Sequence, residues 1–265
     1  AMSDYHGDAL NDDQLLRYSR QLLLQEFDLD GQQALAGATV LLVGCGGLAN
    51  PASLYLAGAG VGRLLLVDDD RVDTSNLHRQ IAFRGDQVGE GKAGALAAQL
   101  RALNPDVMVE PHTARVDREW LDRHLPDVDL VLDCSDNFAA RQAANAACVA
   151  HRKPLVSGAA IRLDGQLAVF DLRRPDSACY ACVYGAGTDG DLACSEAGIL
   201  GPVVGTVGTL QALLAIHLLT GTPVAPALRV FDGRTLGWRE VAFKKDPGCP
   251  VCGETTSPPP ERSTR

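Results

Sequence analysis

The sequence has no excess of basic residues and no internal repeat. Its 24 Lys and Arg residues are outnumbered by 33 Asp and Glu residues, which gives a formal net charge of −9 at pH 7. A nucleic-acid partner requires a basic surface for its phosphates, so this balance argues against one. The start of the chain has no charged segment followed by an apolar run, and we therefore expect a cytoplasmic protein.

A long unbroken apolar run is also missing. The most hydrophobic stretch, residues 197–228, is interrupted in its first half at Gly198, Gly201, Pro202, Gly205 and Gly208. A transmembrane helix needs about 20 consecutive apolar residues. We therefore predict a helix of the core or of a subunit interface here, and no membrane partner.

Short apolar runs alternate with amphipathic stretches along most of the chain. The predicted strands are residues 39–43, 63–67, 107–110, 129–133 and 154–157. The predicted helices between them are residues 47–60, 91–103 and 137–150. This alternation is typical of an α/β fold with a Rossmann-like, doubly wound, mostly parallel sheet and helices on both faces.

The remaining segments complete the predicted organisation. Residues 1–36 are predicted as an N-terminal helical arm, an amphipathic helix followed by a turn at 28–31, and residues 254–265 as a disordered tail. Residues 37–253 are predicted as a single domain. Its later part is predicted to contain a long loop at 179–201, followed by an apolar helix. Strand-like runs at 166–171, 228–232 and 237–243 predict an antiparallel extension of the sheet.

Glycines follow the first predicted strand and open the next helix. Residues 44–49 read Gly-Cys-Gly-Gly-Leu-Ala and match the G-x-G-x-x-G/A fingerprint, in which Gly44, Gly46 and Gly47 let the backbone approach phosphate oxygens. Asp68 ends the second strand, where an acidic side chain accepts hydrogen bonds from a ribose. A nucleotide site is predicted, although an NAD-dependent oxidoreductase or a glycine turn without a ligand would share these features.

Polar residues after Asp68 favour a triphosphate over a dinucleotide. Asn76, Arg79 and Lys92 are placed to converge on phosphates, although each one singly is also compatible with a solvated surface. Asp136 follows the fourth strand at the edge where open α/β sheets bind ligands. It is a candidate magnesium carboxylate or the N-cap of the helix that begins near Asn137.

Eight cysteines in a chain without a secretion signal indicate metal binding or reactive thiols rather than a disulfide framework. Two CxxC pairs, Cys179 with Cys182 and Cys249 with Cys252, predict a tetrahedral Zn²⁺ site. Four thiolates leave no open position for a substrate, so this zinc is predicted to be structural. The alternative is a pair of redox dithiols.

The other four cysteines are of two kinds. Cys45, Cys134 and Cys148 adjoin apolar segments and are predicted as small core residues. Cys194 lies in a polar, glycine-flanked segment, where it is either a nucleophile or an inert packed thiol.

In order and spacing, these motifs resemble those of the HesA/MoeB/ThiF family of adenylyltransferases, which is related to ubiquitin-activating enzymes. The resemblance is strongest to the molybdopterin-synthase branch, with the thiamine branch close to it. Ala49 stands where the family usually has glycine, and His78 where it usually has glutamine. The matching segments are residues 17–21, 44–49, 75–80, 133–137, 157–160 and 247–252.

The resemblance implies a homodimeric enzyme that uses ATP and Mg²⁺ to adenylate the C-terminal glycine of a small ubiquitin-like sulfur carrier of the MoaD type. A thiamine sulfur carrier of the ThiS type is the alternative partner. An NAD-dependent oxidoreductase and a non-enzymatic zinc scaffold are more distant alternatives.

The resemblance also implies roles for individual residues. Asp68 would bind the ribose, Asp136 the magnesium, and Arg20 would reach the ATP site of the neighbouring subunit. Cys194 matches the position of the family's candidate thioester cysteine. The expected catalytic residues are Arg20, Arg79, Lys92, Asp136 and Cys194. The expected nucleotide-binding residues are Gly44, Gly46, Gly47, Asp68, Asp70, Ser75, Asn76, Leu77, His78, Arg79, Lys92, Asp136 and Asn137.

Overall fold

The computed structural model describes residues 10–186 and 198–253, which contain an eight-stranded sheet of order β3-β2-β1-β4-β5-β6-β7-β8. The first five strands along the chain pair in parallel, and the last three continue the sheet in antiparallel fashion. This confirms the predicted fold class. The strands are β1 (Thr39–Val43), β2 (Arg63–Val67), β3 (Met108–His112), β4 (Leu130–Asp133), β5 (Leu155–Ile161), β6 (Asp164–Phe170), β7 (Ala227–Asp232) and β8 (Gly237–Ala242).

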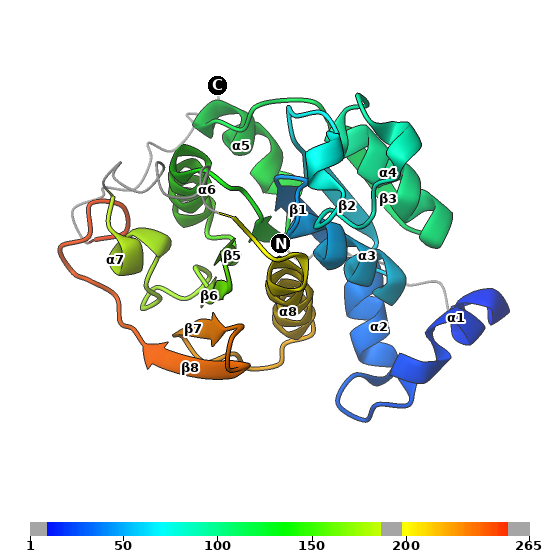
Figure 1. Ribbon diagram of the computed structural model, residues 1–265. Helices are drawn as coiled ribbons and strands as arrows, with labels where there is room; N and C mark the ends of the chain where they lie inside the picture. The colour runs from blue at the N-terminus through cyan, green and yellow to red at the C-terminus, as the bar shows by residue number, and fades with distance from the viewer. Residues whose placement is uncertain (1–9, 187–197, 254–265) are drawn as a thin grey trace, which may run out of the picture.

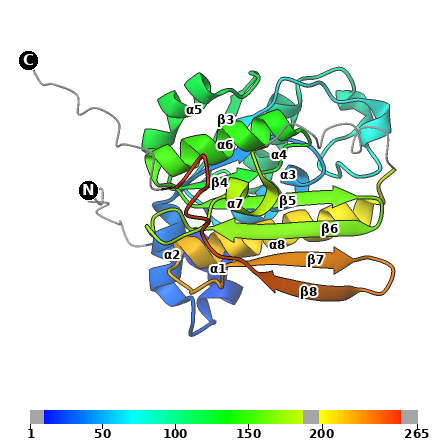
Figure 2. The ribbon, with the colours of Figure 1, turned by 90° about the vertical axis from the view of Figure 1, so that its left-hand side faces the viewer.

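Helices cover both faces of the sheet (Figure 1). One buried cluster joins the sheet to α3 (Ala49–Ala59), α4 (Lys92–Leu103) and α8 (Gly201–Leu219). A second cluster on the other face joins it to α5 (Arg118–His124), α6 (Phe138–His151) and α7 (Tyr180–Tyr184). Figure 2 shows β5 to β8 side by side, with α8 behind β5 and β6.

The apolar strand sequences follow from burial on both faces. Along β1, Val40 and Leu42 belong to the first cluster, whereas Leu41 and Val43 belong to the second. Successive side chains of a strand point to opposite faces, so a strand covered on both sides is apolar throughout. The remaining helical segments are α1 (Asp12–Leu22), α2 (Asp28–Ala36) and the 3₁₀ turns η1 (Thr74–Asn76), η2 (Gly85–Gln87) and η3 (Leu125–Asp127).

Two parts of the secondary-structure prediction were wrong. The turn predicted at 28–31 is the start of α2, and the chain turns earlier, where the carbonyl of Leu24 accepts hydrogen bonds from the N–H groups of Phe27 and Asp28. Helix α5 was not predicted. It is short, and it begins where the Asp117 carboxylate accepts a hydrogen bond of 2.8 Å from the N–H of Trp120.

Helix α1 packs at the amino edge of the sheet. The Gln21 amide donates to the carbonyl of Ala59, at the end of α3, and Arg17 donates to the carbonyl of Leu103, at the end of α4. Because α3 and α4 run back across the sheet before β2 and β3 begin, these helix ends lie beside the amino ends of the strands.

Helix α8 is the predicted apolar helix, and it belongs to the core. By length and composition alone it could cross a membrane, but half of its apolar window is buried inside the described part of the chain. Its residues Val204, Val207, Ala212 and Ala215 pack in the same cluster as α3. The core position predicted for this helix is confirmed.

Two glycines one turn apart in α8 have different surroundings. A Cβ atom on Gly208 would collide with the carbonyl oxygen of Leu48 and lie 2.8 Å from Cγ of Pro51, whereas one on Gly205 would meet no atom within 4 Å. Gly208 thus allows α8 to approach the start of α3 closely.

These surroundings predict opposite effects for the same substitution. Gly208→Ala is expected to lower the free energy of unfolding by about 2 kcal/mol, because overpacking forces the helices apart. Gly205→Ala is the matched control, and the helix preference of alanine is expected to raise that energy by about 0.5 kcal/mol. Urea denaturation measures both changes, and equal effects would contradict the close packing.

Candidate active site

A cleft of about 1420 Å³ opens at the carboxyl ends of the parallel strands. The strand order reverses between β1 and β4, and open α/β sheets bind their ligands at such a point. The cleft is lined by the glycine loop after β1, the acidic end of β2, residues 76 and 78–80, the first turn of α6 and the end of β5.

The glycine loop needs glycine at its first position. Gly44 has a φ of +88°, and a Cβ atom there would lie 2.8 Å from the carbonyl oxygen of Cys134. The fully buried amide of Asn50 donates to the carbonyls of Cys45 and Gly46 and accepts from the N–H of Ala82. Asn50 therefore fixes the glycine loop against the loop that carries Arg79. The fingerprint pattern did not single out this residue.

Asp68 is bound to the backbone of the glycine loop. Its carboxylate accepts a hydrogen bond of 2.7 Å from the N–H of Cys45 and one of 2.8 Å from the N–H of Asp70. Burial raises the pKa of Asp68, although both N–H donors and the charge of Lys92 oppose this rise. The side chain thus joins β2 to the loop and lines the cleft.

The basic side chains of Lys92 and Arg79 both line the cleft. The Nζ atom of Lys92 lies 2.8 Å from a carboxylate oxygen of Asp70, and the lysine is largely buried. Arg79 donates to the carbonyl of Ser75 at 2.9 Å and lies 3.0 Å from Nε2 of His78. Asn76 and His78 also line the cleft, so Asn76, Arg79 and Lys92 lie around one cavity together with the glycine loop.

Asp136 is exposed and lines the cleft immediately before α6. The N-cap of α6 is Asn137, whose side chain accepts from the N–H of Ala140 at 2.9 Å. The alternative of Asp136 as the N-cap is therefore wrong, and its carboxylate has no capping role in α6.

Some predicted site residues lie elsewhere. Ser75 donates its hydroxyl to Asp73, Leu77 packs against the core, and neither lines the cleft. Arg20 is exposed on α1 at the opposite edge of the sheet. Cys194 lies outside the described residues.

A buried ionic network lies beneath the cleft. The carboxylate of Asp133 accepts hydrogen bonds from the hydroxyls of Ser135 and Ser157, at 2.6 and 2.9 Å, and pairs with Arg141 at 3.3 Å. Burial alone would lower the pKa of Arg141, but the charges of Asp133 and of two tyrosines of α7 more than offset this effect, so the pKa is raised. Sequence reasoning missed this arginine, although it is a lone charge in an alanine-rich helix.

A second buried polar group supports the same region from α8. The amide of Gln211 donates to the carbonyls of Asp133 and Val156, at 2.8 and 3.2 Å. A single glutamine in an apolar helix was the available signal for this contact.

The four predicted metal ligands come together on the α6 side of the sheet. The Sγ atoms of Cys179, Cys182, Cys249 and Cys252 all lie within 4.8 Å of one another. Three of their separations are 3.4, 3.7 and 3.9 Å, close to the edge of about 3.8 Å expected for four thiolates around one zinc ion. The cluster fits zinc, and it joins segments that are 70 positions apart in the chain.

The three other described cysteines are core residues, as predicted. Cys45, Cys134 and Cys148 are buried, and burial is the first cause of the raised pKa of each thiol. Neutral, enclosed thiols of this kind are poor nucleophiles.

The fold and the cleft define an α/β nucleotide-binding protein with a four-cysteine metal cluster. A profile of the ThiF family matches residues 18–251, and the chain belongs to this family. The chain is similar to the sulfur carrier protein ThiS adenylyltransferase of Escherichia coli (strain K12), with 47% identity over 94% of this chain and 100% of that protein. It is also similar to the molybdopterin-synthase adenylyltransferase of the same organism, with 43% identity over 92% and 99%.

These relatives define the enzyme class. Both are adenylyltransferases, and the chain is accordingly a nucleotidyltransferase that uses ATP. Among solved structures, E. coli MccB with ATP superposes with a TM-score of 0.77 at 23% identity, covering 89% of this chain and 74% of that one. This likeness supports the fold alone.

The metal cluster predicts selective loss of zinc. Cys252→Ser is expected to lower bound zinc from one ion per chain to less than about 0.2 and to reduce the melting temperature, because three thiolates hold the ion less tightly than four. Elemental analysis of purified protein measures the zinc. Cys148→Ala is the control, since it removes a buried thiol outside the cluster, and it should retain one ion. Full zinc content in Cys252→Ser would refute the assignment.

Proposed function

We propose that this chain adenylates the C-terminal glycine carboxylate of a small ubiquitin-like sulfur-carrier protein and releases pyrophosphate. The proteins named in the descriptions of its two relatives, the sulfur carrier ThiS and molybdopterin synthase, motivate this choice. The observation that carries it is the composition of the cleft, in which Arg79, Lys92 and Asp136 line the same cavity as the glycine loop.

Each side of the cleft has a distinct role in this proposal. Asp68 binds the ribose hydroxyls, while the N–H groups of the glycine loop meet the phosphates. Asn76, Arg79 and Lys92 oppose the negative charge that develops on the α-phosphate and the leaving pyrophosphate. To contact phosphate, Lys92 exchanges part of its interaction with Asp70 for the incoming anion.

The nucleophile needs no general base, because a carboxylate is already ionised at neutral pH. Catalysis then depends on in-line positioning of the carboxylate and the α-phosphorus and on charge neutralisation. Asp136 is the proposed ligand for Mg²⁺, which supplies further positive charge at the phosphates when bound. Cys194 stays a candidate for a later covalent step.

The identity of the carrier is the finer part of the proposal. The sequence motifs favoured a MoaD-type carrier, whereas identity is higher to the ThiS adenylyltransferase, at 47% against 43%. Both types of carrier are therefore candidate partners. The motifs favour the MoaD type, which is the first candidate, and overall identity favours the ThiS type, which is the second.

Carrier-dependent ATP–pyrophosphate exchange tests the function directly. Radiolabelled pyrophosphate should enter ATP only when a carrier with an intact C-terminal glycine is present, since only the reversible acyl-adenylate step links the two. MoaD-type and ThiS-type carriers are offered side by side, and the true partner is expected to give at least about tenfold higher kcat/KM. Carriers lacking the terminal glycine are the control. The proposal would be refuted if neither intact carrier supported exchange, or if the protein bound NADH tightly in place of ATP.

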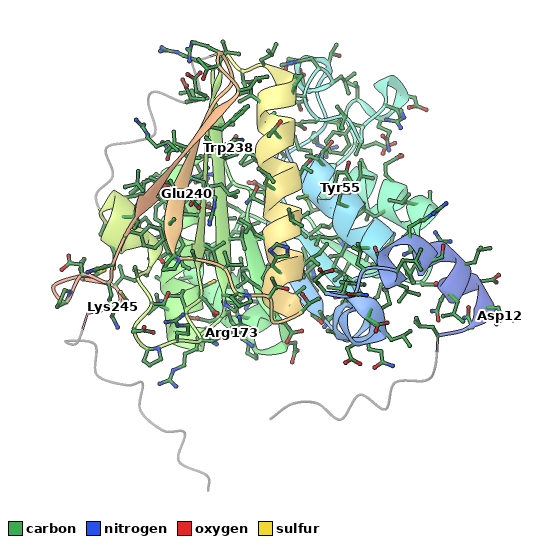
Figure 3. The ribbon with its side chains drawn as sticks, turned by 90° about the horizontal axis from the view of Figure 1, so that it is seen from below. Asp12, Tyr55, Arg173, Trp238, Glu240 and Lys245 are labelled. Atoms are coloured by element: carbon green, nitrogen blue, oxygen red, sulfur yellow. The ribbon has the colours of Figure 1, made fainter. Side chains whose placement is uncertain are left out.

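A homodimer is part of the proposal, and the fold gives a physical reason for it. Large apolar side chains are exposed on neighbouring helices, with Leu16 of α1 at 76% exposed, Tyr55 of α3 at 59% and Leu213 of α8 at 46%. Figure 3 shows Tyr55 beside α8 on this face. Exposed apolar surface of this kind is typical of a subunit interface.

The position of Arg20 makes the dimer necessary for its proposed role. Arg20 lies on α1 at the amino edge of the sheet, whereas the cleft opens at the carboxyl edge. Within one subunit the two are separated by the sheet, so Arg20 can meet phosphates only in a neighbouring subunit.

Mixed dimers of two inactive variants test this arrangement. Arg20→Ala and Asp136→Ala are each expected to lower carrier-dependent exchange by at least about a hundredfold, because each removes a charge from the reacting phosphates. When equal amounts are unfolded and refolded together, one site of each mixed dimer regains both residues, and activity should return to about a quarter of wild type. No recovery would refute the exchange of Arg20 between subunits, and normal activity of Asp136→Ala would refute the magnesium assignment.

A further inference from the structure

The four-cysteine cluster meets helix α6 at a buried polar side chain. Asn145 lies on the face of α6 that packs against the sheet and α7, where its buried neighbours are Ala144, Ala147 and Cys148 (Figure 1). Its side chain is completely enclosed. An amide among small apolar side chains needs hydrogen-bond partners within the protein, because burial removes those that water supplies.

Two hydrogen bonds join Asn145 to the first CxxC segment. Its side-chain oxygen accepts from the N–H of Tyr180 at 2.9 Å, and its side-chain nitrogen donates to Sγ of Cys179 at 3.5 Å. Tyr180 is the first residue of α7, so its N–H has no acceptor within that helix. Because a main-chain N–H can only donate, this bond fixes which end of the amide faces the sulfur. The group that meets Cys179 is therefore an N–H donor.

An N–H donor suits this position because of the charge on a loaded cluster. Four thiolates and one Zn²⁺ together have a net charge of about −2. Cys179 and Cys249 are almost completely buried, and a buried anion is stabilised by donors directed at it. The main-chain N–H of Asp246 makes a similar contact of 3.5 Å with Sγ of Cys182. Asn145 adds a donor from outside the two segments that carry the ligands.

We propose that Asn145 is a positioning residue of the metal cluster, which orients the thiolate of Cys179 and ties α6 to the metal site. Metal binding and the packing of α6 are then linked. Loss of the ion frees Cys179 and Tyr180, and it leaves the amide of Asn145 without these partners in the interior. This role concerns the metal alone and holds whichever carrier protein the enzyme uses.

Asn145→Ala tests this role, because it removes both hydrogen bonds and places one more alanine on an alanine-rich helix face. Zinc affinity, measured by competition with a chromophoric chelator, is expected to fall roughly ten- to a hundredfold, as is typical when a residue that orients a metal ligand is removed. In the cobalt-substituted protein, the thiolate-to-metal charge-transfer band should move to longer wavelength, because a thiolate that loses an N–H donor gives up electrons more readily.

Asn104→Ala is the matched control. Asn104 is also fully buried, and its side chain donates to the carbonyl of Ala57 at 2.8 Å and accepts from the N–H of Asp106 at 3.2 Å. It follows α4 at the amino edge of the sheet. Its loss of thermal stability should be comparable with that of Asn145→Ala. Its zinc affinity should stay within about twofold of wild type, with an unchanged cobalt spectrum, because the two sites are far apart.

Hydrogen–deuterium exchange of wild type tests the tie to α6 without any substitution. Removal of the ion by a chelator is expected to speed exchange of residues 145–151 by about tenfold or more, because the buried amide loses its partners. Residues 92–103 form α4 on the opposite face of the sheet and are the internal control. They should exchange at the rate of the zinc-bound protein.

Several results would overturn the role of Asn145. They are wild-type zinc affinity in Asn145→Ala, an unmoved charge-transfer band in that variant, or equal changes in Asn104→Ala. Chelation that leaves residues 145–151 unchanged, or that speeds residues 92–103 equally, would overturn the tie to α6. If Asn145→Ala does not fold, the deuterium measurement on wild type decides. Inactivity of wild type with every carrier would refute the proposed function and leave these results as they stand.

Discussion

The buried carboxylate of Asp133 is the interaction on which the architecture of the cleft depends. An uncompensated charge in the interior costs several kcal/mol, so the fold must bring donors to it. They come from Ser135, from Ser157 of β5 and from Arg141 of α6, while the main-chain carbonyl of the same residue accepts from Gln211 of α8. Two strands and helices on both faces of the sheet therefore meet at one polar point directly below the nucleotide cleft.

The parallel part of the fold could be predicted from the sequence because burial on both faces leaves a simple signature. The segments 39–43 and 63–67 are apolar at every buried position, and they match β1 and β2. The segments 28–36 and 118–124 carry no such pattern. Short helices have little stability of their own. Whether they form depends on tertiary contacts, such as the burial of Leu35 and Trp120, which the local sequence does not reveal.

The residues of the candidate site also fall into those that the sequence predicts and those that it does not. Gly44 and the cysteine pairs could be predicted because backbone conformation and metal geometry each require certain residue types at certain spacings. Asn50, Arg141 and Gln211 could not, because their role depends on partners brought together by folding. Gln211 and Asp133, for example, are 78 positions apart. A polar residue in an apolar helix signals only that some partner exists.

The order in which the chain is synthesised gives helix α8 a further significance. Helix α8, whose Gly208 abuts the start of α3 beside the glycine loop, lies between the two CxxC pairs in the sequence. The glycine loop leaves the ribosome long before α8, and the second cysteine pair follows later still. Because domains fold as their segments emerge, the early half of the sheet can be fully packed only once α8 has been synthesised. The nucleotide cleft of a nascent chain is therefore complete only after α8, far beyond the glycine loop in the sequence, has been synthesised.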